Sequence, residues 1–444
     1  PELQHGLGAL EKLQVGFLLL HATNGNRVSQ LVNRKLGSIV RQSFLVTFEG
    51  TVPGNAGIAK IARCVDINPV KTRNLADLAV KNRIDLAVVG PEVALEAGIV
   101  DEFQKHRIKI FGPNKNAAKL ESSKVYAKEF MRKYHIPTAP FKKFSSSGAA
   151  IGFCKSVEYP VVIKADGLAA GKGVFVVDNF DEASDTITKI MEDSSFGIAG
   201  KNIIVESFLR GQEVTIMAFS DGKTIVPMLP SQDHKQAYDG DKGPNTGGMG
   251  AYCPTSFVTP EIMEEIDGQV LNPFLKGLEK EGLIYRGVIY AGIMLTSSGL
   301  KVLEFNCRFG DPETQVVLPL LRTDFFDILM ATATGKLQSI GKLSWREQTS
   351  ACVVMASKGY PGKYPTGLTI RGLDIKLGNG NYIFHAGTGR KSNNWVTAGG
   401  RVLNIVGLES NLKLALDKAY RMVKNIKFDG AMYRKDIGFR SLQA

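Results

Sequence analysis

The chain has 444 residues, enough for about three domains. Its 55 basic and 43 acidic residues give a net charge of +12, and such an excess attracts nucleic acids, acidic membranes or phosphorylated metabolites. No basic run is interleaved with aromatic residues, so the composition does not favour nucleic-acid binding.

The five cysteines are scattered and form no C-x-x-C pair. This pattern argues against a disulfide framework and against a zinc site, and it is typical of a reducing compartment. No apolar run approaches the length of a membrane span. We therefore expect a cytoplasmic protein with no membrane partner and no nucleic-acid partner.

Near the amino terminus, two apolar runs predict buried strands at residues 84–90 and 108–113. Residues 95–106 between them have helical spacing, so strand, helix and strand follow in order. This order predicts a parallel sheet, in which ligands bind at the carboxyl ends of the strands. An earlier apolar run, residues 15–20, predicts a first strand.

The segment "KADGLAAGKG" at residues 164–173 lies between two predicted strands. It is not a P-loop, because the glycine spacing is one residue short and Gly173 stands where a Ser or Thr should follow the lysine. A glycine-rich hairpin that covers phosphates is one interpretation, and a plain flexible hairpin is the other. Lys164 ends an apolar strand, and burial of its charge without an anionic partner would be costly, which favours the phosphate interpretation.

Residues 230–254 form a long, polar, glycine-rich segment, "PSQDHKQAYDGDKGPNTGGMGAYCP". We expect a loop without secondary structure of its own, and loops of this length are usually functional or disordered. The Asp, His and Lys residues inside the segment favour a functional loop.

The segment "LEFNCRFGDPE" at residues 303–313 places five polar or charged groups at the end of an apolar strand. Glu304 and Asn306 are two residues apart, so their side chains lie on the same face. Two oxygen ligands on one face suit Mg²⁺ held together with nucleotide phosphates, and the fork of Arg308 suits a phosphate or a carboxylate. The alternative is a solvated strand end with a salt bridge.

These motifs follow one another in a specific order: "KADGLAAGKG", "VESFLRGQE", "SQDHK", "GPNTGGMGAY" and "EFNCRFGDPE". In this order the chain resembles the ATP-grasp superfamily and, within it, the glycinamide ribonucleotide synthetase family. The likeness covers residues 53–440 and is greatest to the eukaryotic form, which is often one module of a multifunctional purine-pathway enzyme. A different ATP-grasp ligase, such as a carboxylase, is less well matched by "GPNTGGMG" beside "SQDHK".

The resemblance implies an α/β fold: an amino-terminal Rossmann-like domain, an ATP-grasp unit and a small carboxy-terminal α+β domain. We expect boundaries at residues 1–121, 122–202, 203–328 and 329–444, where 122–202 and 203–328 are the lid and core of the ATP-grasp unit. The implied reaction uses ATP and Mg²⁺ or Mn²⁺ to join glycine to 5-phosphoribosylamine through glycyl phosphate. It needs no protein nucleophile, because catalysis is positioning and charge neutralisation.

The resemblance also implies roles for individual residues. Those expected to bind ATP are Lys124, Lys164, Gly167, Gly171, Lys172, Gly173, Glu206, Phe208, Leu209 and Glu213. Those expected to bind the metal are Glu304 and Asn306. Those expected around glycine and the acyl phosphate are Arg308, Asp311, Asp233, Lys235, Asn245 and Thr246. Those expected to hold 5-phosphoribosylamine are Pro53, Gly54, Asn55, Gly90, Pro91 and Glu92.

Residues 1–52 depart from the family, which begins with a strand and "GSGGREHALAWKL"-like residues. In their place stands "LLLHATNGNRVSQ", where only "NGNR" at residues 24–27 is a faint echo. A frame slip or gene-model error is the interpretation we favour. The others are a chain that has lost substrate binding and serves as an ATP-grasp remnant or interaction domain, and a compensated site that uses Asn24, Asn26 and Arg27.

Overall fold

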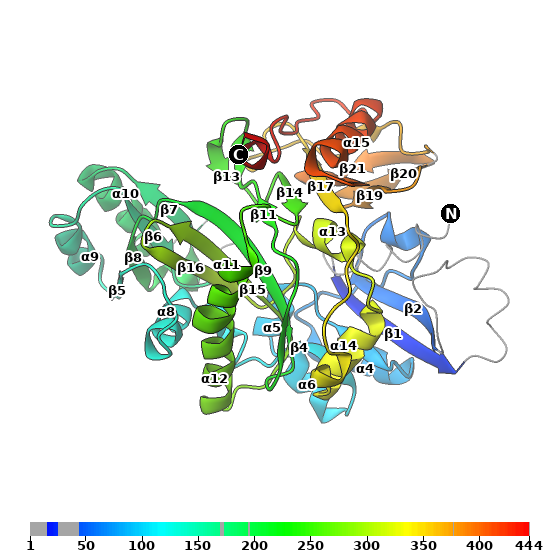
Figure 1. Ribbon diagram of the computed structural model, residues 1–444, viewed down its shortest axis with the longest axis horizontal. Coiled ribbons are helices and arrows are strands. Elements are labelled where there is room, and N and C mark those ends of the chain that lie inside the picture. Colours follow the sequence, from blue (N-terminus) through cyan, green and yellow to red (C-terminus); the bar gives the residue numbers. More distant parts are fainter. Residues whose placement is uncertain (1–15, 25–43, 169–172, 194–195, 376, 444) are drawn as a thin grey trace.

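The computed structural model describes residues 16–24, 44–168, 173–193, 196–375 and 377–443 (Figure 1). Of residues 16–24 and 44–53 it describes the backbone only. None of the helices in these described ranges is long and apolar enough to cross a membrane. The molecule contains a large central sheet, a separate four-stranded sheet at the left of Figure 1, and a carboxy-terminal sheet above both.

The central sheet combines the amino-terminal region with the core of the ATP-grasp unit. Its strand order is β10-β9-β15-β4-β3-β1-β2, and β16 pairs with β15. β3 and β4 are parallel, as the sequence predicts, and short helices connect them. The bounds are β3 Leu86–Val88, β4 Lys109–Pro113, β9 Gln212–Ser220, β10 Ile225–Pro227, β15 Tyr285–Thr296, β16 Gly299–Asn306, α4 Thr72–Lys81, α5 Glu92–Glu96 and α6 Ile99–Lys105.

Alternating residues of β9 and β15 supply two cores, because successive side chains of a strand point to opposite faces. Ile216 and Ile289 pack into the core with the helices α11 and α12, whereas Met217 and Val288 pack into the core with α14. The helical segment from Pro260 to Lys280 is interrupted by one π-helical turn. The bounds are α11 Pro260–Ile266, the π turn Asp267–Leu271, α12 Asn272–Lys280, α13 Thr314–Val317 and α14 Phe325–Thr334.

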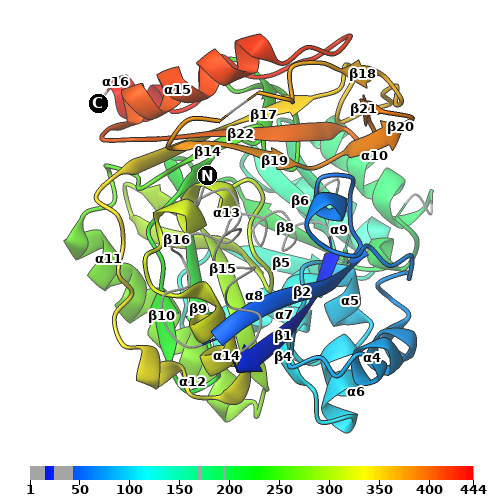
Figure 2. The ribbon, with the colours of Figure 1, turned by 90° about the vertical axis from the view of Figure 1, so that its right-hand side faces the viewer.

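The first strands of the central sheet run in an unexpected direction. β1 (Gly16–Asn24) confirms the predicted strand, but it is antiparallel to both β3 and β2 (Phe44–Pro53). Leu18 pairs with Val88, so Asn24 lies at the edge of the sheet opposite to the carboxyl end of β3. Figure 2 shows β1 and β2 in dark blue beneath the carboxy-terminal sheet.

The lid of the ATP-grasp unit is an antiparallel sheet in the order β5-β8-β6-β7. The predicted strand–loop–strand is confirmed as β6 and β7, and Ser123 caps α8 by accepting a hydrogen bond from the backbone N–H of Tyr126. The helices α9 and α10 share one apolar core with this sheet. The bounds are α7 Lys119–Ser122, α8 Lys124–Lys133, β5 Phe141–Phe144, α9 Ser147–Cys154, β6 Val161–Ala165, β7 Val174–Val177, α10 Phe180–Met191 and β8 Ile203–Ser207.

The carboxy-terminal sheet has the order β11-β14-β17-β22-β19, and α15 packs on it. Its first two strands come from residues 230–254, so our expectation of a loop without secondary structure is wrong. Both strands pair with partners distant in sequence, which a local pattern cannot reveal. The bounds are β11 Gln232–Asp233, β12 Gln236–Tyr238, β13 Lys242–Asn245, β14 Gly250–Cys253, β17 Thr349–Ala356, β18 Thr369–Ile370, β19 Asn381–His385, β20 Thr388–Lys391, β21 Asn394–Thr397, β22 Arg401–Glu409, α15 Leu412–Asn425 and α16 Phe439–Gln443.

Candidate active site

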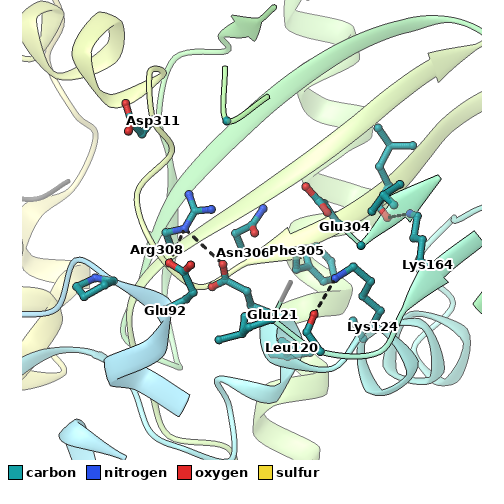
Figure 3. Close-up of a pocket in the computed structure, with 18 of the residues that line it drawn as sticks. Glu92, Leu120, Glu121, Lys124, Lys164, Glu304, Phe305, Asn306, Arg308 and Asp311 are labelled. Carbon is teal, nitrogen blue, oxygen red and sulfur yellow. Dashed lines mark hydrogen bonds and ion pairs between the residues drawn. The ribbon is translucent and has the colours of Figure 1, made fainter. Parts of the chain in front are cut away.

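A cavity of about 380 Å³ lies beside the end of β16, where the amino-terminal region, the lid and the carboxy-terminal sheet all contribute lining residues. It brings together side chains that are far apart in sequence, and Figure 3 shows Lys124, Lys164, Glu304, Asn306 and Arg308 along it. The predicted site residues that line it are Gly90, Pro91, Glu92, Lys124, Lys164, Gly167, Gly173, Glu304, Asn306, Arg308 and Asp311.

The predicted metal ligands Glu304 and Asn306 both lie on β16 and both line the cavity. Burial acts to raise the pKa of Glu304, but Lys235, Lys164 and Lys124 outweigh it and hold that pKa below its ordinary value. The carboxylate is therefore ionised, as a ligand of Mg²⁺ must be. No group of three or more His, Cys, Asp or Glu side chains in the described ranges could hold a metal alone. One carboxylate and one amide oxygen suit Mg²⁺ that is held together with nucleotide phosphates and water.

Two predicted lysines face Glu304 across the cavity. Nζ of Lys124 donates to the carbonyl oxygen of Gly167 at 3.2 Å, which ties helix α8 to the glycine-rich hairpin. Burial is the main reason that the pKa of Lys124 is lowered, and Glu304 opposes it. Lys164 is buried on β6, and its Nζ donates to the carbonyl oxygen of Leu303 at 3.3 Å. Both ammonium groups therefore border the cavity on the side of Glu304.

Glu206, which was predicted to hold the adenine, lies on β8 and forms ion pairs with two lysines. It pairs with Lys164 and, at 2.6 Å, with Lys128. Nζ of Lys128 also donates to the hydroxyl oxygen of Thr138 at 2.6 Å, and burial lowers the pKa of Lys128 to about 8. Glu206 does not line the cavity, whereas both of its lysine partners do.

Three other predicted nucleotide residues, Phe208, Leu209 and Glu213, do not line the cavity. Phe208 and Leu209 follow β8 and are half-buried. Glu213 is the second residue of β9 and forms an ion pair with Lys235. Gly171 and Lys172 lie outside the described residues.

At the amino-terminal end of the cavity, Arg308 lies between two carboxylates. Its Nε is 3.4 Å from Oε2 of Glu92 and 3.4 Å from Oε1 of Glu121 (Figure 3). Oε2 of Glu121 accepts a hydrogen bond from the backbone N–H of Cys307 at 2.7 Å. Burial raises the pKa of Glu121 to about 7; Glu92 adds to the rise, and Arg308 opposes it. Arg308 is therefore fixed in direction by both carboxylates.

The residues of the 230–254 segment that were predicted to surround the substrate glycine do not line the cavity. Gly247 of the same segment does line it. Asp233 has a buried Oδ1 with no hydrogen-bond partner in the described part of the chain, and burial raises its pKa well above the ordinary value. Thr246 donates its hydroxyl to the carbonyl oxygen of Lys235 at 2.8 Å, and Asn245 is exposed on β13.

Pro53, Gly54 and Asn55, which were predicted to hold 5-phosphoribosylamine, lie at the carboxyl end of β2 and do not line the cavity. Nδ2 of Asn55 donates to the carbonyl oxygens of His385 at 2.7 Å and Ala386 at 3.2 Å. Its Oδ1 accepts from the backbone N–H of Ile58 at 2.9 Å. The side chain therefore joins the amino-terminal region to the carboxy-terminal domain, and Pro53 and Gly54 precede it.

Sequence reasoning missed three charged side chains that line the cavity: Glu121, Lys128 and Arg401. Lys128 could have been found, because it follows Lys124 by one helical turn and therefore lies on the same face. Glu121 lies on the short helix α7, and no local pattern in the sequence links its charge to Arg308. Nothing near Arg401 in the sequence connects it to Asp311.

Three family models cover most of the chain. The N, ATP-grasp (A) and C domains of phosphoribosylglycinamide synthetase match residues 36–121, 122–314 and 350–440. The chain belongs to the phosphoribosylglycinamide synthetase family. It is therefore an ATP-grasp ligase, and the predicted fold class is confirmed.

Relatives of this family are similar over most of the chain. The phosphoribosylamine–glycine ligase of Caldanaerobacter subterraneus is 50% identical over 87% of this chain and 92% of its own. The human trifunctional purine biosynthetic protein adenosine-3 is 47% identical over 88% of this chain, which corresponds to 39% of the human protein. The solved phosphoribosylamine–glycine ligase of Thermotoga maritima has a TM-score of 0.76, at 34% identity, and covers 88% of this chain and 93% of its own.

A biotin carboxylase domain from Hydrogenobacter thermophilus, solved with MgADP and bicarbonate, has a TM-score of 0.66 at 16% identity. It covers 84% of this chain and 82% of its own. At this identity the likeness shows the shared ATP-grasp fold alone.

Proposed function

We propose that this chain joins glycine to 5-phosphoribosylamine at the expense of ATP, giving glycinamide ribonucleotide, ADP and phosphate in purine synthesis. The observation that carries the proposal is that one cavity is lined by two lysines, by the ionised Glu304 that they face, and by Arg308. Relatives named for this ligation match nine tenths of their own length, which favours an enzyme over a non-catalytic remnant.

The nucleotide end of the cavity is assigned to ATP. Lys124 and Lys164 neutralise its phosphates, and the hairpin with Gly167, Gly171, Lys172 and Gly173 covers them. Glu206, Phe208 and Leu209 hold the adenine and Glu213 the ribose. Glu304 and Asn306 would hold Mg²⁺, or Mn²⁺ in its place, which would supply positive charge beside the transferred phosphoryl group. The three lysines that lower the pKa of Glu304 support the assignment.

The reaction requires two bond exchanges. A carboxylate oxygen of glycine attacks the γ-phosphorus of ATP, the bond to the β-phosphate breaks, and ADP leaves glycyl phosphate behind. The amine of 5-phosphoribosylamine then attacks the acyl carbon, phosphate departs, and the amine proton passes to the released phosphate or to solvent. No covalent bond to the protein forms, so positioning and electrostatic stabilisation supply the rate.

Several side chains orient the reacting groups. Arg308, held by Glu92 and Glu121, faces the carboxylate of glycine and the acyl phosphate. The remaining residues assigned to the glycine side are Asp233, Lys235, Asn245, Thr246 and Asp311. The residues assigned to 5-phosphoribosylamine are Pro53, Gly54, Asn55, Gly90, Pro91 and Glu92.

We further propose a cytoplasmic setting, because every substrate and product is a small polar metabolite. Association with other purine-pathway enzymes is supported by the trifunctional relatives, of which this chain matches 39%. We also propose a division at residues 121, 202 and 328 into the four parts expected from the sequence.

The test is phosphate release from ATP by the purified chain with Mg²⁺ and glycine, with and without freshly prepared 5-phosphoribosylamine. We expect release that depends on 5-phosphoribosylamine, and an equal amount of glycinamide ribonucleotide by mass spectrometry. ATP binding without stimulated release would contradict the proposed ligation and would support the loss of the amino-terminal substrate site.

A further inference from the structure

The side chain of Arg401, at the start of β22, reaches from the carboxy-terminal domain into the cavity. Its Nη1 donates to the carbonyl oxygens of Gly247 at 2.6 Å and Asp311 at 2.8 Å. Its Nη2 donates to Oδ2 of Asp311 at 2.8 Å. One guanidinium therefore joins three segments: the glycine turn at 247–248, the turn after β16, and β22.

The glycine turn is shaped for this contact. A Cβ on Gly247 would lie 3.0 Å from Cζ of Arg401. Gly248 has a φ of +109°, and a Cβ there would lie 2.4 Å from Cδ of Pro312 and 2.8 Å from Oδ1 of Asp233. No side chain fits at these two positions without displacing its neighbours, so the turn and Arg401 approach as closely as backbone allows.

The charge of Arg401 also has a function at this end of the cavity. Burial acts to lower the pKa of Arg401, but Asp311, Tyr360, Asp233 and Glu313 outweigh it and raise that pKa. Three of these neighbours are carboxyl groups. Without the guanidinium, the carboxylates of Asp311 and Glu313 would repel the carboxylate of an incoming glycine and the acyl phosphate that it becomes.

We propose that Arg401 is a positioning residue for glycine: it fixes the Gly247–Gly248 turn and Asp311 and offsets the carboxylates around the glycine site. This inference rests on the proposed ligation of glycine. It concerns the end of the cavity away from Lys124 and Lys164, with which Arg401 makes no contact in the described ranges. The affinity for glycine should therefore depend on Arg401, and the affinity for ATP should not.

The experiment compares the KM for glycine with the KM for ATP in the Arg401→Met chain. We expect the glycine KM to rise about 30-fold and the ATP KM to change less than about threefold. Arg401→Lys should raise the glycine KM about tenfold, because an ammonium keeps the charge but lacks the planar fork that reaches both turns. Arg421→Met, an exposed arginine on α15, is the matched control and should leave both constants unchanged.

A second variant covers the case in which Arg401→Met does not fold. The hydroxyl oxygen of Tyr360 accepts a hydrogen bond from the backbone N–H of Gly247 at 3.0 Å. Tyr360→Phe should therefore raise the glycine KM about threefold by loosening the same turn. Equal rises in both KM values in Arg401→Met, or a glycine KM within about twofold of the original in both variants, would overturn the proposal.

Hydrogen exchange separates a failure of this inference from a failure of the proposed function. If the original chain makes no product, the ligation is wrong, but the backbone amides of residues 246–250 can still be followed without substrates. They should exchange faster in Arg401→Met than in the original chain and in Arg421→Met. Unchanged exchange at these amides would overturn the positioning role whatever the activity.

Discussion

The two ends of the cavity, one at Glu304 and the other at Arg308 and Glu121, shift the pKa of their carboxyl groups in opposite directions. At the nucleotide end, burial raises the pKa of Glu304, but Lys235, Lys164 and Lys124 outweigh it and lower that pKa. At the amino-terminal end, burial is the main cause that raises the pKa of Glu121 to about 7; Glu92 adds to the rise and Arg308 opposes it. Lysines therefore keep the carboxylate ionised at one end of the cavity, whereas burial favours the protonated carboxyl at the other.

The backbone differs between the two ends as well. The nucleotide end lies on β16, which pairs with β15 over its whole length. The amino-terminal end lies beyond β3, whose neighbour β1 runs antiparallel. Asn24, at the end of β1, therefore lies at the edge of the sheet opposite to the carboxyl end of β3. Asn26 and Arg27 lie outside the described residues.

The largest effect is expected from removal of the metal carboxylate. Glu304→Ala should lower phosphate release about 1,000-fold, because an ionised ligand contributes several kcal/mol to a charged transition state. Glu279→Ala is the matched control, since Glu279 is an exposed residue on α12. Turnover is measured at saturating ATP and Mg²⁺, together with the melting temperature.

A melting temperature close to that of the original chain would show that the fold survives the Glu304→Ala change. If this variant then keeps turnover within about tenfold of the original, Glu304 does not bind the metal, and the contrast between the two ends loses its functional meaning.

The second effect concerns stability at the amino-terminal end. Because the folded pKa of Glu121 is raised to about 7, the folded chain binds this proton more tightly than the unfolded chain. The resulting stabilisation is complete below the unfolded pKa and is lost as the pH rises through about 7. Between pH 5 and pH 7 the loss is on the order of 2 kcal/mol. Glu121→Gln should lack this part of the pH dependence.

Urea unfolding at several pH values, with EDTA and without nucleotide, measures this difference. Glu279→Gln serves as the control and should follow the original chain at each pH. Parallel curves for Glu121→Gln and the original chain would show that Glu121 titrates normally, and the two ends would then be electrostatically alike.

Local sequence patterns singled out several residues that line the nucleotide end of the cavity, whereas the predicted Glu206, Phe208, Leu209 and Glu213 do not line it. Glu304 and Asn306 are two residues apart on one strand, and Lys164 directly precedes the glycine-rich hairpin, so period and spacing suffice. The resemblance added the order of the motifs, and the comparisons confirm the family and the fold.

The remaining features depend on contacts between distant segments. An apolar run predicts a strand but not its direction, so the antiparallel course of β1 could not be foreseen. β11 and β14 belong to a sheet whose other strands, β17 and β22 among them, come from much later in the chain. The sequence of residues 230–254 alone therefore suggests a loop. Arg401 meets Asp311 across 90 residues of sequence, and no local pattern links the two.

The smallest effect is expected from Lys164, although it lies at the positively charged end. Its ammonium already pairs with Glu206, and Lys128 pairs with the same carboxylate. Part of its charge is thus offset, so Lys164→Met should weaken Mg²⁺–ATP binding only about tenfold. Isothermal titration calorimetry measures the dissociation constant, and Lys276→Met, an exposed lysine on α12, is the control.

The outcome decides whether the lysines act on ATP or only on Glu206. If the dissociation constant of Lys164→Met stays within about twofold of the original, the ammonium belongs to a buried structural pair and Lys164 leaves the nucleotide site. If binding weakens as expected while Lys276→Met is unchanged, the lysines at the nucleotide end act on the phosphates of ATP. The electrostatic contrast with the end near Glu121 then has a direct cause in ligand binding.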